Sequence, residues 1–338
     1  MKLKKNILKA VLLYTLSCII TIQLYAQSND ANDGYITFKA PSSNFIDVEI
    51  EAHKGLPRFG DLLFKKINKE LSTQMAFEEL VKMKYMSTAY ADMDKNKLTK
   101  KDRSQAADKK VDNSVFAQSH LLRLAGMVCS EEVLKKYFCD DSSTQPCSYA
   151  IGKYGKRPRP SYWGGVRNFN VNEFKQHRSF TSFTKDHLEE LQAWSKTFFP
   201  KDELIAYYVS RAAISVPGWG QKPYDFKKKG YLIFSQMNGK QFLHSSWFEA
   251  TDENEKKLGH SSSGIFLPMP PEKAKALKFQ KGSPIFLVYK VKINASETEF
   301  SKLKLSFVLE NRIIEVYKDN ALTQKIGEIS VDNINTKH

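Results

Sequence analysis

The stretch that decides the fold is Ile-Phe-Leu-Val-Tyr-Lys-Val-Lys-Ile, residues 285–293. Every second residue from Ile285 to Ile293 is apolar, and Lys290 and Lys292 alternate with the last of them. Residues 303–309 show the same alternation, with leucine or phenylalanine at each odd position. Successive side chains of a strand point to opposite faces, so each stretch has one apolar face. The pair predicts an antiparallel sheet with one face in the core and the other in water.

The chain after Pro200 has the hydrophobic period of strands throughout. Besides 285–293 and 302–309, we expect strands at 204–215, 231–237, 240–248, 312–317 and 322–329. Asn238-Gly239 predicts a two-residue hairpin turn between two of them, because both residues tolerate the positive φ angles of a type I′ turn. One short helix is expected at 272–278, directly after two prolines.

The chain before Pro200 is mainly helical in its pattern. Apolar residues at intervals of three and four predict helices at 61–71, 73–90, 114–128 and 185–198, and a short helix that ends at Phe138. Ser130 and Thr184 are the expected N-caps of the short helix and of the helix at 185–198. The remaining features are a strand at 45–52, a polar linker at 91–112 and an irregular basic loop at 140–170.

These patterns predict an α+β fold with two regions. Residues 27–200 form a mostly helical N-terminal half. Residues 201–338 form an antiparallel β-rich half that holds one short helix.

The first 26 residues have the order of a secretory signal peptide. Lysines at positions 2, 4, 5 and 9 precede an apolar run from Ala10 to Ile22, and polar residues follow Ala26. The apolar run is shorter than the roughly 20 residues of a spanning helix, which disfavours a retained anchor. The residues before Cys18 do not fit a lipoprotein signal. We therefore expect an exported protein, periplasmic or secreted.

The composition is that of a basic globular protein. The 338 residues are 41% hydrophobic and carry a formal net charge of +15, of which four charges belong to the leader. An exported cationic protein often meets anionic polysaccharide or lipid head groups, and nucleic acid is a less expected partner. The alternative is that the charge only keeps the protein soluble, because lysines occur along the whole chain.

Three cysteines follow the leader: Cys129, Cys139 and Cys147. In an oxidising compartment we expect a disulfide between two of them, and the spacing leaves the pairing open. The spacings do not form a Cys-x-x-Cys motif, and no histidine lies at zinc-ligand distance along the chain. The sequence therefore predicts no metal and no cofactor.

Three patterns resemble functional motifs but differ from them in essential positions. Residues 92–102 resemble a calcium loop without its glycine, and four lysines oppose the cation. Residues 259–264, Gly-His-Ser-Ser-Ser-Gly, lack the strand and helix that flank a serine nucleophile. His177 and His187 do not have the spacing of a zinc motif, and we expect both to be exposed.

The basic loop contains the binding residues that we favour from sequence. They combine cations for phosphate, sulfate or carboxylate groups with flat rings that stack on sugars: Lys156, Arg157, Arg159, Tyr162 and Trp163. The alternative is an ordinary surface loop in which Trp163 packs into the core.

Two stretches carry a resemblance to known proteins. They are Tyr224-Asp225-Phe226 with the following Gly230–Phe234, and Leu267-Pro268-Met269-Pro270-Pro271-Glu272-Lys273-Ala274. With the strand after Ile285, they make residues 200–335 resemble exported bacterial proteins that carry an uncharacterised domain. This resemblance implies no activity and no site residue.

Three functions fit these features, and we expect a binding protein rather than an enzyme. The first is a binding or envelope-associated module for an anionic glycan or lipid surface. The second is a hydrolase of cell-envelope material, which would require titratable groups that meet in a cleft. The third is a structural or assembly protein, which would show an exposed apolar patch on the C-terminal sheet.

Overall fold

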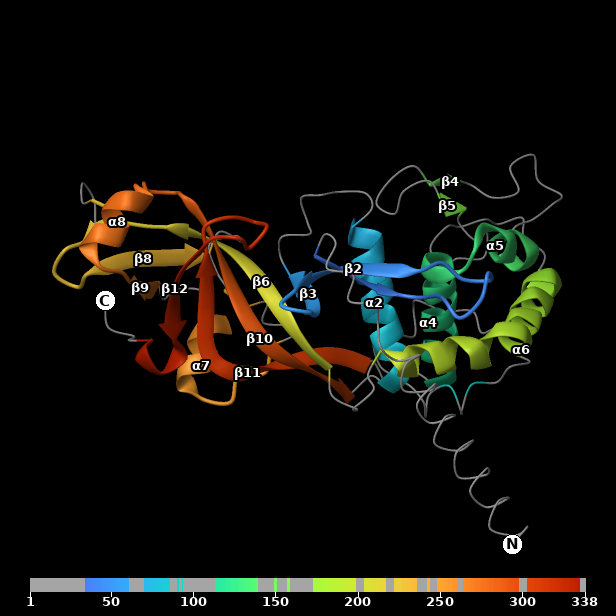
Figure 1. The fold of residues 1–338 in the computed structure, drawn as a ribbon. Helices are drawn as coiled ribbons and strands as arrows, with labels where there is room; N and C mark the ends of the chain where they lie inside the picture. Colours follow the sequence, from blue (N-terminus) through green and yellow to red (C-terminus); the bar gives the residue numbers. More distant parts are fainter. Residues whose placement is uncertain are drawn as a thin grey trace, which may run out of the picture.

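The computed structural model describes residues 34–60, 70–85, 90, 93, 113–138, 149–150, 157–158, 173–198, 204–216, 222–235, 242–243, 248–259, 264–297 and 303–334. Within these ranges the protein is α+β, with six helices, ten strands in one mixed sheet and a separate pair of short strands (Figure 1). Several predicted features lie outside the described residues: the leader, most of the helix at 61–71, almost all of the linker at 91–112, most of the loop at 140–170 and the Asn238-Gly239 turn.

The centre of the sheet is the strand quoted first. β10 (Pro284–Glu297) lies between β6 (Leu204–Ile214) and β11 (Leu303–Tyr317) and pairs antiparallel with both, as predicted. The two strands expected at 302–309 and 312–317 are one strand with an irregularity, because Tyr289 pairs with Ile314 whereas Val291 pairs with Leu309. The extra residues of β11 form a bulge, which bends the strand without ending it.

The sheet buries both faces near Val288. Ile285, Leu287 and Tyr289 lie in the main core, as the alternation predicts. The opposite face was expected to contact water, but Phe286 and Val288 are buried there in a second cluster. This cluster also contains Tyr207, Val209, Tyr317 and Leu322, with Leu56 packed against it. The even-numbered residues Phe286 and Val288 are themselves apolar, so this part of β10 is hydrophobic on both faces.

The N-terminal half contributes strands to the same sheet, so the two halves are not cleanly helical and β. β1 (Tyr35–Phe38), β2 (Val48–His53) and β3 (Leu56–Gly60) form a meander, and β3 pairs parallel with β6. Gly60 has φ +132°, and a Cβ there would lie 2.3 Å from the Val209 carbonyl oxygen. Only glycine permits this close approach of β3 to β6.

The last residues of β6 pair with a strand of the C-terminal half. β8 (Gly230–Ser235) pairs with the end of β6 and with β7 (Tyr224–Asp225) on one side, and with β9 (Ile265–Pro268) on the other. Both edges of β8 are therefore paired at Ile233, and the described part of the strand expected at 240–248 is not a continuous strand. The hairpin turn itself lies outside the described residues. Within 240–248, Phe242 and Leu243 are buried in a bend, and both of their N–H groups donate to the Leu258 carbonyl.

The last strand lies at the end of the sheet, next to β9. β12 (Lys325–Ser330) pairs with β11 and lies beside β9, where a Cβ on Gly327 would meet the Leu267 side chain at 2.9 Å. Two short helices flank this end, α7 (Glu253–Gly259), which was not predicted, and α8 (Pro271–Leu277), which was. The chain then forms a 3₁₀ turn at Val331–Asn333.

The helices of the N-terminal half gather at the other end of the molecule (Figure 1). They are α2 (Glu70–Tyr85), α4 (Asn113–Val128), α5 (Glu131–Phe138) and α6 (Glu173–Thr197). Ser130 begins α5 as predicted, since its Oγ accepts the Val133 N–H at 3.4 Å. Thr184 is not a cap: α6 begins eleven residues earlier, and the Thr184 hydroxyl donates to the Phe180 carbonyl within the helix.

His187 is buried, contrary to the expected exposure of both histidines. Its side chain lies on α6 against Phe45, Tyr137 and Phe183, with ring centroids 5.3 to 5.8 Å apart. His177 is partly exposed on the same helix.

None of the described helices is both long enough and apolar enough to cross a bilayer.

Candidate functional site

The basic loop favoured from sequence is described only in part. Arg157 begins β5 (Arg157–Pro158), which pairs with β4 (Tyr149–Ala150), and nothing is described of its side chain. Lys156, Arg159, Tyr162 and Trp163 lie outside the described residues, as do Cys139 and Cys147. Cys129 is buried at the end of α4. The binding role of the loop and the disulfide both stay predictions.

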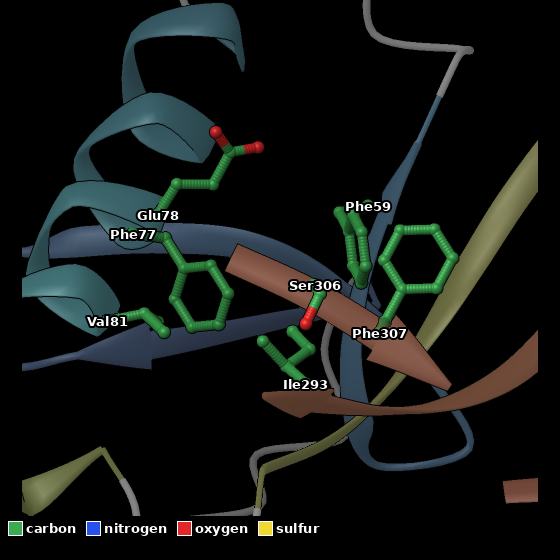
Figure 2. Close-up of a pocket in the computed structure, with 7 residues that line it drawn as sticks. All are labelled: Phe59, Phe77, Glu78, Val81, Ile293, Ser306 and Phe307. Atoms are coloured by element: carbon green, nitrogen blue, oxygen red, sulfur yellow. The ribbon is translucent and has the colours of Figure 1, made fainter. Parts of the chain in front are cut away.

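A small apolar cavity lies between α2 and the sheet (Figure 2). Its volume is about 10 Å³, which is at the lower limit for one water molecule and far below the size of a substrate site. The lining residues are Phe59, Phe77, Glu78, Val81, Ile293, Ser306 and Phe307. Figure 2 shows the Glu78 carboxylate directed away from Ser306. Ser306 Oγ is buried without a hydrogen-bond partner among the described residues, so no base activates it as a nucleophile.

A first group of titratable side chains, the Glu79 network, joins α2 to α4. Glu79 Oε2 accepts from Arg123 Nη2 at 2.6 Å and lies 2.9 Å from His120 Nε2. Glu79 Oε1 accepts from Lys82 Nζ at 2.8 Å, and the Tyr90 hydroxyl lies 2.5 Å from His120 Nδ1. Tyr90 is 2% exposed and His120 is 1% exposed. The carboxylate, the imidazole and the phenol of this network are therefore buried, whereas the Arg123 side chain is 41% exposed.

The ionisation of the Glu79 network follows from its depth. Burial would raise the pKa of Glu79, but the hydrogen bond from His120 and the charges of His120, Lys82 and Arg123 hold that pKa well below its ordinary value. Burial lowers the pKa of His120, against the opposing effect of Glu79. Burial raises the pKa of Tyr90. Burial is thus the largest influence on His120 and Tyr90, whereas the surrounding donors and cations outweigh it at Glu79.

A second group, the Glu315 network, lies beside the second apolar cluster. Glu315 Oε1 accepts from Lys54 Nζ at 2.5 Å and from Lys325 Nζ at 3.1 Å. Its Oε2 accepts from the Tyr317 hydroxyl at 2.9 Å and lies 3.5 Å from His53 Nε2. Burial would raise the pKa of Glu315, but the donors Lys54, Tyr317 and Lys325 lower it to about 2. All of these groups bind one another, so the network fastens the β2–β3 turn to β11 and β12.

A lysine-rich end lies on the opposite side of the molecule from α2, α4, α5 and α6 (Figure 1). It consists of residues 222–230, which include the β7–β8 turn, and residues 271–281, which include α8. The two segments carry eight lysines against two acidic residues, a formal excess of six positive charges. All eight lysines are exposed: Lys222, Lys227, Lys228, Lys229, Lys273, Lys275, Lys278 and Lys281.

Backbone and aromatic contacts hold the two segments together. The Lys229 carbonyl accepts from the Met269 N–H at 2.9 Å, and the Tyr224 hydroxyl donates to the Met269 carbonyl at 2.8 Å. Tyr231 packs edge-on against Phe279, with ring centroids 5.5 Å apart. Figure 1 shows α8 beside β8 at this end of the molecule. Lysines that are about 45 residues apart in sequence therefore share one surface.

Most lysines of this end have no ion-pair partner within the described part of the chain. No ion pair joins Lys227, Lys229 or the lysines of 273–281 to another described residue. One apolar side chain also protrudes here, since Phe226 is 75% exposed. The sequence signal was the run Phe226–Lys229, but its meeting with 271–281 depends on the pairing of β8 with β9.

The described residues contain no group of three or more histidine, cysteine, aspartate or glutamate side chains placed to hold a metal ion. The lysine-rich end is a cationic surface, built from a turn and a helix that tertiary contacts bring together. Comparisons with models of protein families, with curated proteins and with solved structures found no match to this chain.

Proposed function

We propose that the protein is a binding module for anionic surfaces and that the lysine-rich end is its binding site. The observation that supports this is the excess of six positive charges on eight exposed lysines of two joined segments. Phosphate, sulfate and carboxylate groups of glycans or lipid head groups are the ligands that such a surface attracts. Export to the cell envelope, implied by the leader and by the resemblance of residues 200–335, would bring the protein to these polymers.

The arrangement of the titratable groups favours a binder over a hydrolase. Carboxylate, imidazole and phenol groups meet around Glu79 and around Glu315, and also where Tyr137 donates to Asp186 beside His187. Glu79 and Glu315 are each paired with cations and donors of their own network. A hydrolytic site would need an acid or base that is free to contact a substrate.

A heparin column tests the proposal, with heparin as a soluble polyanion. Replacing Lys227, Lys228 and Lys229 together by glutamine should lower the salt concentration at which the protein elutes, because each lysine contributes about 1 kcal/mol near an anionic surface. The matched control replaces three exposed lysines elsewhere by glutamine: Lys185, Lys196 and Lys318. Equal elution of the wild type and the first variant would refute the proposal.

The same column separates this site from the loop predicted in the sequence. Arg157→Ala with Arg159→Ala should weaken retention if Lys156, Arg157, Arg159, Tyr162 and Trp163 form a second contact. Unchanged retention of that variant, with reduced retention of the Lys227–Lys229 variant, would assign binding to the lysine-rich end alone.

A further inference from the structure

One large apolar side chain at the lysine-rich end is exposed and does not pack in the core. Phe226 is 75% exposed at the tip of the β7–β8 turn, and its ring contacts Tyr224 edge-on with centroids 4.9 Å apart. Lys227, Lys228 and Lys229 follow it directly, and all three are exposed. An apolar ring surrounded by cations is the composition of protein surfaces that enter the interface of a bilayer.

The turn that presents Phe226 is fixed by its own contacts. Asp225 Oδ1 accepts the Lys228 N–H at 2.9 Å, which closes the turn. Lys229 adopts the left-handed region with φ +55°, and its carbonyl accepts from Met269. Tyr224, beneath Phe226, donates its hydroxyl to the Met269 carbonyl. The ring therefore protrudes from a preorganised turn, so little conformational entropy is lost when it binds.

The charges beside the turn fit a flat anionic partner. α8 presents Lys273 and Lys275, and Lys278 and Lys281 follow it, so cations extend from the turn across a second element. Lysines attract the negative surface of a bilayer, and this attraction falls off within a Debye length. A soluble polyanion would satisfy the lysines but would leave Phe226 in water.

From this we propose, on the basis of the function proposed above, that the lysine-rich end docks on a bilayer of anionic lipids. Phe226 enters the region between the head groups, and the surrounding lysines contact lipid phosphates. Insertion of the ring removes apolar surface from water, and the lysines supply the long-range attraction.

The test is sedimentation of the protein, purified from the cells that express it, with vesicles of phosphatidylglycerol and phosphatidylethanolamine. We expect the wild type to bind these vesicles and to bind pure phosphatidylcholine vesicles at least tenfold more weakly. Phe226→Ala should lower binding to the anionic vesicles about tenfold, and Phe226→Leu should retain most of it. The salt concentration of elution from heparin should be unchanged in both variants.

A matched control is Phe174→Ala, since Phe174 is 73% exposed on α6 in the other half of the molecule. Binding that falls equally in the Phe174 and Phe226 variants would overturn the proposal, because the contact would not lie at this end. A Phe226→Ala variant that loses heparin and vesicle binding alike would also overturn it and would indicate a glycan. A wild type that is retained on heparin but does not bind the vesicles would refute only the bilayer as partner. A wild type that binds neither heparin nor vesicles would refute the proposed function as well.

Discussion

Glu79 and Glu315 are the centres of two networks with the same chemical groups at different depths. Each carboxylate is contacted by one histidine and two cationic side chains. The tyrosine of the Glu315 network donates to the carboxylate itself, whereas the tyrosine of the Glu79 network contacts the histidine. The Glu79 side chain is 5% exposed, whereas the Glu315 side chain is 16% exposed. The first network joins two helices within the core, and the second joins a turn to two strands near the surface.

The comparison indicates how burial changes the contribution of similar contacts to the free energy of unfolding. Water can replace a lost partner near Glu315, because Lys54 and Lys325 are partly exposed. No water replaces a lost partner of His120, which is buried within the helical layer. We therefore expect changes of the buried members Glu79, His120 and Tyr90 to cost more than their counterparts in the Glu315 network.

The largest effect should come from the carboxylates themselves. Glu79→Gln should lower the free energy of unfolding by about 3 kcal/mol, because it removes the negative charge that pairs with Lys82 and Arg123. Glu315→Gln should lower it by about 1 kcal/mol, because its lysines can turn to water. Urea denaturation of both variants measures these values.

Glu132→Gln, on the exposed first turn of α5, is the control for replacing a glutamate as such. Its effect should stay within about 0.5 kcal/mol. Equal losses in the Glu79 and Glu315 variants would contradict the dependence on depth.

The sequence predicted the parts of the fold that depend on local periodicity. The alternation in 285–293 correctly identified β10, the apolar spacing in 114–128 identified α4, and the two prolines before 272–278 identified α8. The helix at 185–198 was predicted too short, because a threonine that caps a helix and one that bonds back within it look the same in sequence.

The features that sequence missed depend on long-range contacts. The apolar stretch at 240–248 has the local pattern of a strand, but β6, β7 and β9 already occupy both edges of β8. Tyr317 lies 264 residues from His53, so no spacing along the chain could reveal that they meet. The lysine-rich end was visible only as the run after Phe226, because its second segment is joined through strand pairing.

The second effect to test is the pH dependence that the two histidines confer. Burial lowers the pKa of both His120 and His53 below the ordinary value of 6.5. The unfolded chain therefore binds protons first as the pH falls, so stability is fully present above about pH 6.5 and decreases below it. We expect a loss on the order of 1 kcal/mol between pH 7 and pH 5.

Replacement of His120 by asparagine should remove more of this slope than the same replacement of His53, because His120 is fully buried. Urea denaturation at pH 7, 6 and 5 compares the three proteins. A wild type that gains stability on acidification in this range would show that the histidines are protonated in the folded state.

The smallest effect, and the finest test of the comparison, comes from the two phenol groups. Tyr317→Phe removes one of the donors to Glu315, and the two lysines still hold that carboxylate, so the loss should be about 0.5 kcal/mol. Tyr90→Phe leaves His120 Nδ1 buried without its partner and should cost about 1.5 kcal/mol.

Nuclear magnetic resonance titration of the Glu315 carboxyl adds a readout that a change in packing would not move. The Tyr317 hydroxyl helps to lower the pKa of Glu315 to about 2, so Tyr317→Phe should raise that pKa while leaving it below its ordinary value. A pKa that does not change would mean that the lysines alone determine the charge of Glu315. In that case the phenol of the Glu315 network would serve only to pack the second apolar cluster, and the likeness between the two networks would end at their composition.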